Sequence, residues 1–569
     1  MVPHRRLAVL AVAAALGFGA CGPVPTAIVS DGPLPTPSAA AGAPTCAPLV
    51  LRPVVAGDWA NDIVYEVFVR SFADSNGDGI GDLKGLTAHL DALNDGNPAT
   101  TTDLGVTALW LMPVASAKSY HGYDVLDYTA IEPDYGTADD MRALTAAAHQ
   151  RGIKVIVDFV PNHTSSENAW FLDALTPDSA HRDWYVWSDT DPAWPSVAGG
   201  NPWHPSGGAY YYGAFWEGMP DLNLRNPDVT TALTDAARVW LTDYGVDGFR
   251  IDAAKHLIED DAKHQISTPE TKAWLAAFRD AVHAARPQAL VVGEVWDPRG
   301  ISSSYTTGGS LDMAFDFGIG DAILSGTGGD ATTLLANESE VATRYAPGLA
   351  GTFLANHDQE RVMTTLRGSV DDARVAATLL LTGPGVPFLY YGEELGLAGG
   401  KPDENIRRPY PWTASGPGFG FTAGVPWEAF GAGATTANAA TESADPTSLL
   451  STYRALTRLR LAHPALADGS FTALRASALH VAAVIRADAT ERLLVVSNLG
   501  KEPAVGVALA AEASPLCGSP TQGELVYPTA DVAPPLAGLP TIGPQGGFDS
   551  WVPFASIPAH TTVVVRLTP

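Results

Sequence analysis

Short apolar runs alternate with amphipathic stretches over most of the chain. The first run, residues 63–72, alternates in hydropathy and carries many β-branched and aromatic residues, which is typical of a β-strand. Similar runs follow at 106–113, 154–160, 246–252, 290–296, 311–317, 351–358 and 386–392. Amphipathic helices lie between several of them, for example a helix that Thr137 caps and Gly152 ends. Strands that alternate with helices form a parallel sheet, so this pattern predicts an α/β fold, a (β/α)8 TIM barrel over residues 58–460.

Two regions depart from this alternation. Residues 164–223, between the third and fourth strand runs, are too long for one connecting helix and are rich in Trp, Tyr, Pro and Gly. They predict a subdomain inserted into the barrel, in which most of the aromatic rings form a small core. After about residue 465 the chain changes to short alternating runs between turns, which predict a C-terminal all-β sandwich over 465–569.

The first residues have the pattern of an export signal. Arg5 and Arg6 precede an apolar stretch that is too short to span a membrane, and small residues stand just before Cys21. This pattern resembles a bacterial lipoprotein signal, with 1–20 removed and Cys21 lipidated. Residues 21–57 are rich in Pro, Ala, Gly and Thr, so we expect a disordered tether there. The predicted location is the outer side of the cytoplasmic membrane, with ordinary signal-peptidase cleavage and secretion as the alternative.

The two remaining cysteines, Cys46 and Cys517, stand far apart in the sequence. An exported protein folds in an oxidising compartment, where two left-over cysteines often pair. We therefore expect a disulfide that joins the end of the tether to the C-terminal domain. Two unrelated thiols are the alternative.

Charge and length exclude some classes of partner. The chain of 569 residues has 34 basic and 62 acidic residues and a formal net charge of −28. Such a charge disfavours binding to nucleic acid or to an anionic membrane surface, so we expect membrane contact only through the lipid anchor. The composition fits a soluble protein, expected to be a monomer, that acts on a neutral substrate.

Three of the strand runs end in a carboxylate: Asp252 in GFRIDAAKH, Glu294 in GEVW and Asp358 in FLANHDQER. The C-terminal ends of parallel barrel strands converge on one face, so these side chains are expected to meet in one pocket. With Arg250 and His357 beside them, they suit bond cleavage through an oxocarbenium-like transition state. A single such residue is more often a helix cap or an ion-pair partner, but three in order favour a catalytic site.

These three runs, together with DFVPNH at 158–163, resemble the signature sequences of the α-amylase family, glycoside hydrolase family 13. The resemblance extends from about Asp58 to the C-terminus. It implies that Asp252 is the nucleophile, that Glu294 is the acid/base and that Asp358 stabilises the transition state. It also implies companions that line the sugar site, namely Arg250, His163 and His357.

The segment YHGYDVLDY at 120–128 follows the second strand run. The resemblance implies that Tyr123 stacks on the sugar at the cleavage site, and that His121 and Asp124 contact its hydroxyl groups. The alternative is a loop that is simply packed by its aromatic rings.

The resemblance assigns three further substrate contacts. Lys255 and His256 are expected on the side of the leaving group. Arg407 or Arg408 is expected to act with Asp124 on the terminal hydroxyls of a chain end, as in relatives that work from the non-reducing end.

The segment DSNGDGIGD at 74–82 places oxygen ligands at alternate positions, and its glycines permit a tight curl. The ligands are Asp74, Asn76, Asp78, the carbonyl of Ile80 and Asp82. Hard oxygen ligands at this spacing resemble the first part of an EF-hand loop and predict a structural Ca²⁺ site, remote from the chemistry. The terminal Glu of an EF-hand is absent, so other groups or water complete the shell. A solvated acidic turn is the alternative, and a second calcium at Asn162 is left open.

The predicted function is retaining hydrolysis of α-glucans such as starch or maltodextrins. MPDLN at 219–223 resembles the intermediate subgroup between oligo-1,6-glucosidases and neopullulanases, so α-1,4 cleavage is expected and α-1,6 cleavage is left open. Arg250 is expected to keep Asp252 ionised, and burial is expected to raise the pKa of Glu294. The alternatives are a transglycosylase of the 4-α-glucanotransferase or trehalose synthase type, and a non-catalytic glycan-binding paralogue.

Overall fold

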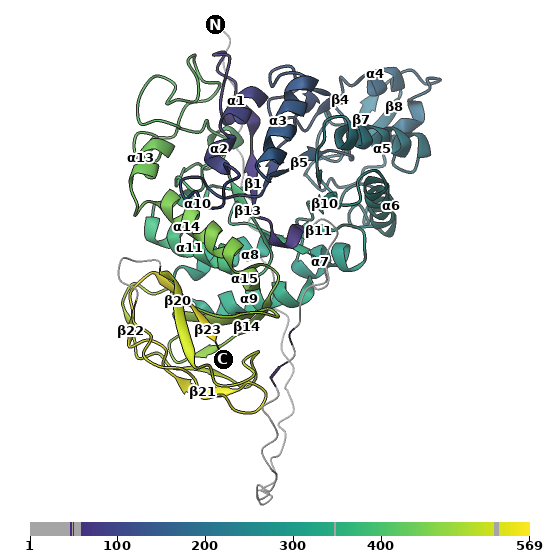
Figure 1. Cartoon of the computed structure of the whole chain (residues 1–569). Coiled ribbons are helices and arrows are strands. Elements are labelled where there is room, and N and C mark those ends of the chain that lie inside the picture. The colour runs from purple at the N-terminus through teal and green to yellow at the C-terminus, as the bar shows by residue number, and fades with distance from the viewer. Residues whose placement is uncertain (1–45, 48, 50–57, 346–348, 529–533, 569) are drawn as a thin grey trace, which may run out of the picture. The chain divides into compact units, whose positions relative to one another are not determined.

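The computed structural model describes residues 46, 47, 49, 58–345, 349–528 and 534–568 (Figure 1). The predicted signal peptide at 1–20, the predicted lipidation site Cys21 and almost all of the expected tether lie outside the described residues. Within the described ranges, no helix is long and apolar enough to cross a membrane.

A closed barrel of parallel strands forms the centre of the fold, which confirms the predicted fold class. Strands that are neighbours in the barrel follow one another along the chain, and β1 pairs with both β2 and β13, which closes the sheet. The barrel strands are β1 Val64–Val67, β2 Ala108–Leu111, β5 Lys154–Phe159, β9 Gly248–Ile251, β10 Leu290–Gly293, β11 Met313–Phe315, β12 Leu349–Thr352 and β13 Val386–Tyr390.

Each barrel strand overlaps one of the predicted runs and is shorter than that run, and for β12 the difference affects the position of a site residue. It ends at Thr352, so Asp358 lies in the turn that follows the strand and is not its last residue. Asp252 and Glu294 directly follow β9 and β10.

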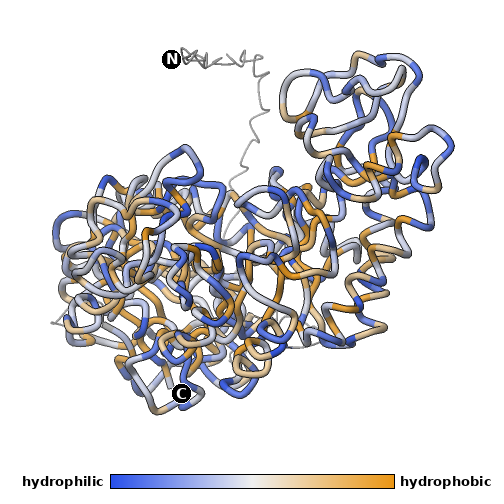
Figure 2. Tube along the Cα trace, turned by 90° about the horizontal axis from the view of Figure 1, so that it is seen from above, coloured by the Kyte–Doolittle hydropathy of each residue, from blue (hydrophilic) through white to orange (hydrophobic). Residues whose placement is uncertain are grey.

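Apolar side chains fill both faces of the barrel strands. Inside the barrel, Trp110 stacks on Phe315 with ring centroids 5.4 Å apart, and Phe315 meets Phe388 edge-on at 4.9 Å. The outer faces pack against the surrounding helices as part of the largest apolar cluster. Burial on both faces explains why these strands are nearly continuous apolar runs in the sequence. Figure 2 shows hydrophobic positions gathered within the body of the fold and hydrophilic positions on many of its outer turns.

The predicted helix after the second strand run is α3, Ala138–Gln150. Thr137 and Asp140 form a capping box at its start, and Gly152 has a φ of 73° just after its end. The other helices of six residues or more are α1 Leu83–Ala88, α4 Ala169–Ala174, α5 Pro227–Thr242, α6 Pro269–Ala285, α7 Arg299–Thr307, α8 Phe317–Gly326, α9 Ala331–Arg344, α11 Val370–Thr382, α13 Ala439–Ala444 and α14 Leu449–Ala462. The shorter helices are η1 Trp59–Asn61, η2 Val69–Ser71, α2 Leu90–Leu93, η3 Arg182–Trp184, α10 Val362–Thr365, α12 Asp403–Ile406 and α15 Pro464–Ala467.

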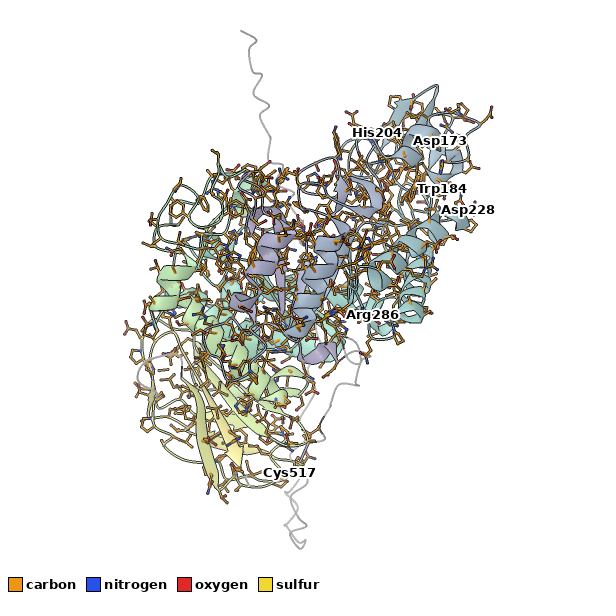
Figure 3. All side chains as sticks on the ribbon, turned by 45° about the horizontal axis from the view of Figure 1, so that its top comes forward. Asp173, Trp184, His204, Asp228, Arg286 and Cys517 are labelled. Atoms are coloured by element: carbon orange, nitrogen blue, oxygen red, sulfur yellow. A yellow bond between two sulfur atoms is a disulfide. The ribbon has the colours of Figure 1, made fainter. Side chains whose placement is uncertain are left out.

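The insertion between β5 and β9 carries a small sheet of its own, in the order β6-β8-β7. Its strands are β6 Trp187–Ser188, β7 Trp203–Ser206 and β8 Ala209–Tyr212, and a hairpin of β3 Ala115–Ala117 and β4 Val125–Ile131 precedes β5. Trp203, Tyr212 and Ala214 form the core of this sheet, so several of its aromatic rings are structural. Figure 3 labels Asp173, Trp184 and His204 from this part of the chain, which lie in the same region of the picture.

The C-terminal region is all β. A five-stranded sheet has the order β14-β16-β17-β23-β20, and a three-stranded sheet has the order β15-β19-β21. The strands are β14 Ser470–Ala473, β15 Arg475–Ala476, β16 Val481–Ala487, β17 Arg492–Asn498, β18 Ala504–Val505, β19 Leu509–Ala511, β20 Gln522–Pro528, β21 Phe548–Trp551, β22 Ser556–Ile557 and β23 Thr561–Thr568. A separate apolar cluster fills the space between these sheets.

An arginine and a disulfide attach neighbouring segments to this region. Arg486 on β16 donates to the carbonyls of Thr382 and Gly383 at 2.6 and 2.8 Å, where α11 ends. Cations suit a helix C-terminus because its last carbonyls carry partial negative charge. Cys46 and Cys517 are joined in a disulfide with Cα atoms 4.5 Å apart, and Figure 3 labels Cys517 in the C-terminal region.

Candidate active site

Arg250 is the centre of a cluster of three carboxylates. Its guanidinium donates to Asp158 Oδ1 at 2.8 Å, to Asp252 Oδ1 at 2.6 Å and to Glu294 Oε2 at 2.9 Å. The three partners stand at the ends of β5, β9 and β10, which are adjacent in the barrel, so the register of parallel strands brings them together. Glu294 Oε2 also accepts the backbone N–H of Ala253 at 3.0 Å. Arg250 itself is 1% exposed and lies beneath the carboxylates.

A second charged cluster surrounds His357. Its Nδ1 lies 2.5 Å from Glu66 Oε1, and its Nε2 lies 3.0 Å from Asp358 Oδ2 and 2.6 Å from the hydroxyl of Tyr123. Burial alone would lower the pKa of His357, but Asp358 and Glu66 outweigh it and raise this pKa to about 9. His357 is therefore a cation at neutral pH.

The charge on Asp358 follows from the same contacts. Burial favours its neutral form, yet His357 and Arg407 together hold the pKa of Asp358 well below its usual range. Arg407 Nη2 lies 3.1 Å from Asp358 Oδ1. Asp358 is thus an anion fixed by two cations.

Asp252 has the opposite behaviour. Burial raises its pKa to about 8 against the attraction of Arg250, and Glu294 and Asp158 raise it further. This differs from the expectation that Arg250 keeps Asp252 ionised, because one guanidinium is shared by three buried carboxylates. The cluster therefore retains a proton at neutral pH, and this proton belongs to the interacting carboxylates as a group.

A cavity of about 360 Å³ opens above the carboxylates. Its lining consists of His121, Tyr123, His163, Phe215, Met219, Asp252, Ala253, His256, Glu294, Asp358, Asp403 and Arg407. Burial lowers the pKa of His163 to about 4 and that of His256 to about 3, so both rings are neutral at pH 7. A cavity with neutral imidazoles, aromatic rings and convergent carboxylates suits a neutral polyhydroxy ligand.

The model of the family "Alpha amylase, catalytic domain" matches residues 66–469, which is more than half of the chain. The chain belongs to the α-amylase family. Alpha-amylase 3 of Dictyoglomus thermophilum is 38% identical over 454 residues, which cover 78% of this chain and 85% of that protein. The crystal structure of the alpha-amylase from H. orenii has a TM-score of 0.77 and 37% identity, and the match covers 89% of this chain and 99% of that chain.

This α-amylase-family chain is a glycoside hydrolase, since relatives of this similarity are named as such hydrolases. The similarity also extends to the trehalose synthase/amylase TreS of Mycolicibacterium smegmatis, at 32% identity over 510 residues that cover 78% of this chain and 84% of that protein. The family and its carbohydrate substrate class are therefore established.

Three residues predicted to contact substrate in this α-amylase-family site also have partners within the protein. Tyr123 stacks on His357 with centroids 5.6 Å apart, so that ring contact is already made within the protein. The carboxylate of Asp124 accepts hydrogen bonds from the N–H and hydroxyl of Ser119 at 3.0 and 2.7 Å. The ammonium of Lys255 donates to the carbonyl of Trp296 at 2.6 Å.

Arg407, one of the two arginines predicted to act with Asp124, makes ion pairs with Asp358 and with Asp403, at 3.1 and 3.2 Å. Its Nε also donates to the carbonyl of His357 at 3.0 Å. Arg407 thus holds the loop of Asp358 in place and borders the cavity.

Several residues of the site were not assigned from the sequence. They are Glu66, Trp110, Asp158, Phe215, Met219 and Asp403. Asp158 is the first residue of DFVPNH, where its position at a strand end is a usable signal. Glu66 is a charged residue within an otherwise apolar barrel strand, which is a second usable signal because such a residue must have a buried partner.

The predicted calcium loop is a tight curl with oxygen-rich side chains. Asp74 accepts backbone N–H groups from Asn76, Gly77 and Gly79 at 2.9, 2.7 and 2.8 Å. Gly77 and Gly79 have φ angles of 84° and 95°, which permit the curl.

The donor set of this loop is all oxygen, which fits Ca²⁺. Asp78 and Asn76 are exposed, whereas both oxygens of Asp82 accept hydrogen bonds from Ser75. Asp82 also caps α1 through Gly85 N–H at 2.7 Å, so it is the least available of the predicted ligands.

Proposed function

We propose that this protein is a retaining α-glucan hydrolase of the α-amylase type that cleaves α-1,4 glucosidic bonds. The observation that carries the proposal is the placement of Asp252 and Glu294 on one guanidinium, at the floor of a cavity suited to sugar. Retaining enzymes hold their nucleophile and acid/base about 5–5.5 Å apart, which a shared Arg250 supports.

In the proposed reaction, the carboxylate of Asp252 attacks the anomeric carbon while Glu294 protonates the leaving oxygen. The glycosyl ester is then hydrolysed by a water that Glu294 deprotonates. This division of roles requires the shared proton of the cluster to be on Glu294 and off Asp252. Arg250 donates to both side chains, at 2.6 Å to Asp252 and at 2.9 Å to Glu294, so it supports an anion at either place.

Asp358 and His357 have a supporting role in this scheme. The carboxylate of Asp358 accepts hydrogen bonds from sugar hydroxyls and stabilises the positive charge that develops on the sugar ring in the transition state. The cation of His357 orients Asp358 through its Nε2 at 3.0 Å. Because Glu66 holds the other nitrogen of His357, the ring stays in one orientation.

The configuration of the first-formed product tests the mechanism. Proton NMR during cleavage of an α-linked substrate is expected to show the α-anomer first. An initial β-anomer would mean inversion, and Asp252 could not be the nucleophile. A product profile on starch, pullulan and maltotriose shows endo or exo action and whether α-1,6 bonds are cleaved.

Transglycosylation is the second candidate, since the relatives include a trehalose synthase/amylase. It uses the same residues and differs only in whether water or sugar accepts the glycosyl group. Incubation with maltotriose distinguishes them. Hydrolysis gives maltose and glucose, whereas transfer gives longer chains or trehalose-type disaccharides without a matching rise in reducing ends.

Two further assignments complete the proposal. The 74–82 loop holds a structural Ca²⁺, with Asp74, Asn76, Asp78 and the Ile80 carbonyl as its main ligands, and this ion stabilises the loop without joining the chemistry. The chain is exported and lipidated at Cys21, with the secreted form as the alternative. Mass analysis of the membrane-bound protein tests the anchor, and a mature form cut elsewhere would exclude it.

A further inference from the structure

Asp158 is a buried carboxylate that has no part in the proposed reaction scheme. Its side chain is 0% exposed, and the cavity lining among the described residues includes Asp252 and Glu294 but not Asp158. Asp158 Oδ1 and Asp252 Oδ1 contact the same nitrogen of Arg250, Nη1, at 2.8 and 2.6 Å. The two carboxylates are therefore close neighbours, although only Asp252 borders the cavity.

Three donors stabilise Asp158 as an anion. Its Oδ1 accepts from Arg250, and its Oδ2 accepts the indole N–H of Trp110 at 3.3 Å and the hydroxyl of Tyr123 at 3.1 Å. Asp252 accepts from Arg250 alone among the side chains of the described residues. Donors stabilise the ionised form of a carboxyl group, so the proton that the cluster retains is disfavoured on Asp158. The two carboxyl groups that line the cavity are left to hold it.

The titration of the two aspartates agrees with this difference in donors. Burial raises the pKa of Asp158 to about 6, against the attraction of Arg250 and His357, and it raises the pKa of Asp252 to about 8. Asp158 is therefore mainly ionised at pH 7. An anion next to two other carboxyl groups opposes the loss of their last proton, because adjacent like charges repel each other.

The other titratable groups around the catalytic cavity leave this balance unchanged. Each cation on the loops after β9, β12 and β13 has carboxylate partners of its own, so Arg250 is the main counter-charge of the cluster. These cations are Lys255 with Asp297, His357 with Glu66 and Asp358, and Arg407 with Asp358 and Asp403. The groups that are uncharged at pH 7 are His121, His163, His256, Tyr123 and Tyr128.

The charge of the cluster is the same before and after the first step of the proposed reaction. Before it, Asp158 and Asp252 are anions and Glu294 carries the proton. In the step, Asp252 bonds to the anomeric carbon, the bond from that carbon to the leaving oxygen breaks, and the proton of Glu294 passes to that oxygen. Asp252 is then a neutral ester and Glu294 an anion. Arg250 again balances two anions, and Asp158 is one of them in both states.

We propose that Asp158 is a positioning residue of this reaction, the permanent anion that keeps one proton on the pair of Asp252 and Glu294 at neutral pH. This inference rests on the proposed function, because it concerns the proton that Glu294 delivers. In the alternative role, Asp158 only anchors the guanidinium of Arg250. The loss of an anchor lowers activity at every pH, whereas the loss of a charge changes the pH at which activity is lost.

The test is the pH profile of kcat/KM for the hydrolysis of maltotriose, which reports the titration of the free enzyme. In the wild type we expect activity to fall as the pair loses its proton, with a midpoint at about pH 8. Asp158→Asn keeps the shape of the side chain and removes its charge, so this midpoint should move to lower pH by about one unit or more. Asp158→Glu keeps the charge and changes the shape, so it should lower kcat without moving the midpoint.

Asp247→Asn is the matched control. Asp247 is also a buried aspartate with an arginine partner, Arg286, but it directly precedes β9, whereas Asp252 directly follows that strand. Asp247→Asn should lower the Tm and leave the midpoint of the pH profile in place. Circular dichroism shows whether each variant is folded.

Two results would overturn this proposal alone. One is a wild-type profile whose activity already falls through the ordinary carboxyl pKa of about 4, which needs no variant to be measured. The other is a folded, active Asp158→Asn protein whose midpoint equals that of the wild type, or whose shift is matched by Asp158→Glu or Asp247→Asn. A wild type that hydrolyses no α-glucan would instead contradict the proposed function, and this inference with it.

Discussion

Two buried arginines of this protein have opposite charge environments. Arg250 is 1% exposed and contacts three carboxylates, whereas Arg361 is 2% exposed and contacts two backbone carbonyls and the rings of Tyr390 and Tyr391. The excess of negative charge around Arg250 makes that cluster retain a proton. Arg361 has no carboxylate at ion-pair distance among the described residues, and carbonyl oxygens and aromatic rings surround its guanidinium. The same side chain thus supports proton chemistry in one place and holds loop carbonyls together in the other.

The largest effect is expected at the carboxylates that share Arg250. Asp252→Asn should reduce kcat by about 10⁴-fold or more, because an amide cannot form the glycosyl ester. Glu294→Gln should also be severe, but less so with an activated leaving group that needs no proton. The measurement is steady-state hydrolysis of maltotriose and of an aryl α-maltoside. Asp549→Asn, at an exposed position, is the control, and turnover by Asp252→Asn comparable to the control would disprove the assignment.

Removal of the two arginines compares the two environments directly. Arg250→Met should lower the free energy of unfolding by roughly 3–5 kcal/mol, because it leaves Asp158, Asp252 and Glu294 without their shared cation. Arg361→Met should cost clearly less, because it removes two hydrogen bonds to carbonyls but breaks no ion pair among the described residues. Denaturant unfolding of both variants measures the difference. Equal or reversed costs would show that Arg361 is neutralised by a group within the protein.

The predicted calcium loop is a third charge environment. There a metal ion, and not an arginine, is expected to balance the carboxylates. With calcium about 100-fold above its Kd, the ion should stabilise the fold by about 2.7 kcal/mol, so chelation should lower the Tm. Asp78→Ala should lower it to a similar extent, and Asp549→Ala should not. Thermal melts with and without chelator measure this. Metal analysis without calcium, combined with a melt that the chelator does not change, would exclude the site.

The smallest effect concerns pH. The pKa of His357 is about 9 in the folded protein and ~6.5 in an unfolded chain, so its contribution to stability is complete below pH ~6.5 and is lost as pH rises through about 9. The raised pKa of Asp252 acts in the same direction, because folding takes up a proton between pH ~4 and about 8.

We therefore expect stability to fall by roughly 1 kcal/mol or more between pH 7 and 9, measured as Tm against pH. Glu66→Gln should reduce this slope, because Glu66 is one of the two anions that hold the proton on His357. Glu524→Gln, at an exposed position, is the matched control. A slope that is the same in both variants would contradict the assigned role of Glu66.

The sequence predicted the barrel well because its strands are buried on both faces and read as apolar runs. The start of α3 was equally clear, since Thr137 caps it through a contact only three residues away. Exact strand ends were less predictable. β12 ends at Thr352, before the carboxylate run is complete, because strand ends depend on pairing with neighbours that are distant in sequence.

The candidate site was predicted in part. Asp252, Glu294 and Asp358 were recognised from their positions after strand runs, and they line one cavity. The partners Asp158 and Glu66 were missed as site residues, although one lies in a recognised motif. Their contacts with Arg250 and His357 join residues that are 92 and 291 positions apart in the chain, so no local spacing in the sequence reports them.

The sequence by itself determined the order of elements, the family resemblance and the chemical types of side chain at the strand ends, because these depend on local periodicity and on short motifs. The tertiary structure alone decided how charge is balanced. It placed three carboxylates on Arg250 and none on Arg361, and it turned Arg407 toward Asp358. Electrostatic balance depends on burial and on distances of a few ångströms between residues far apart in the chain, and neither quantity can be read from one sequence.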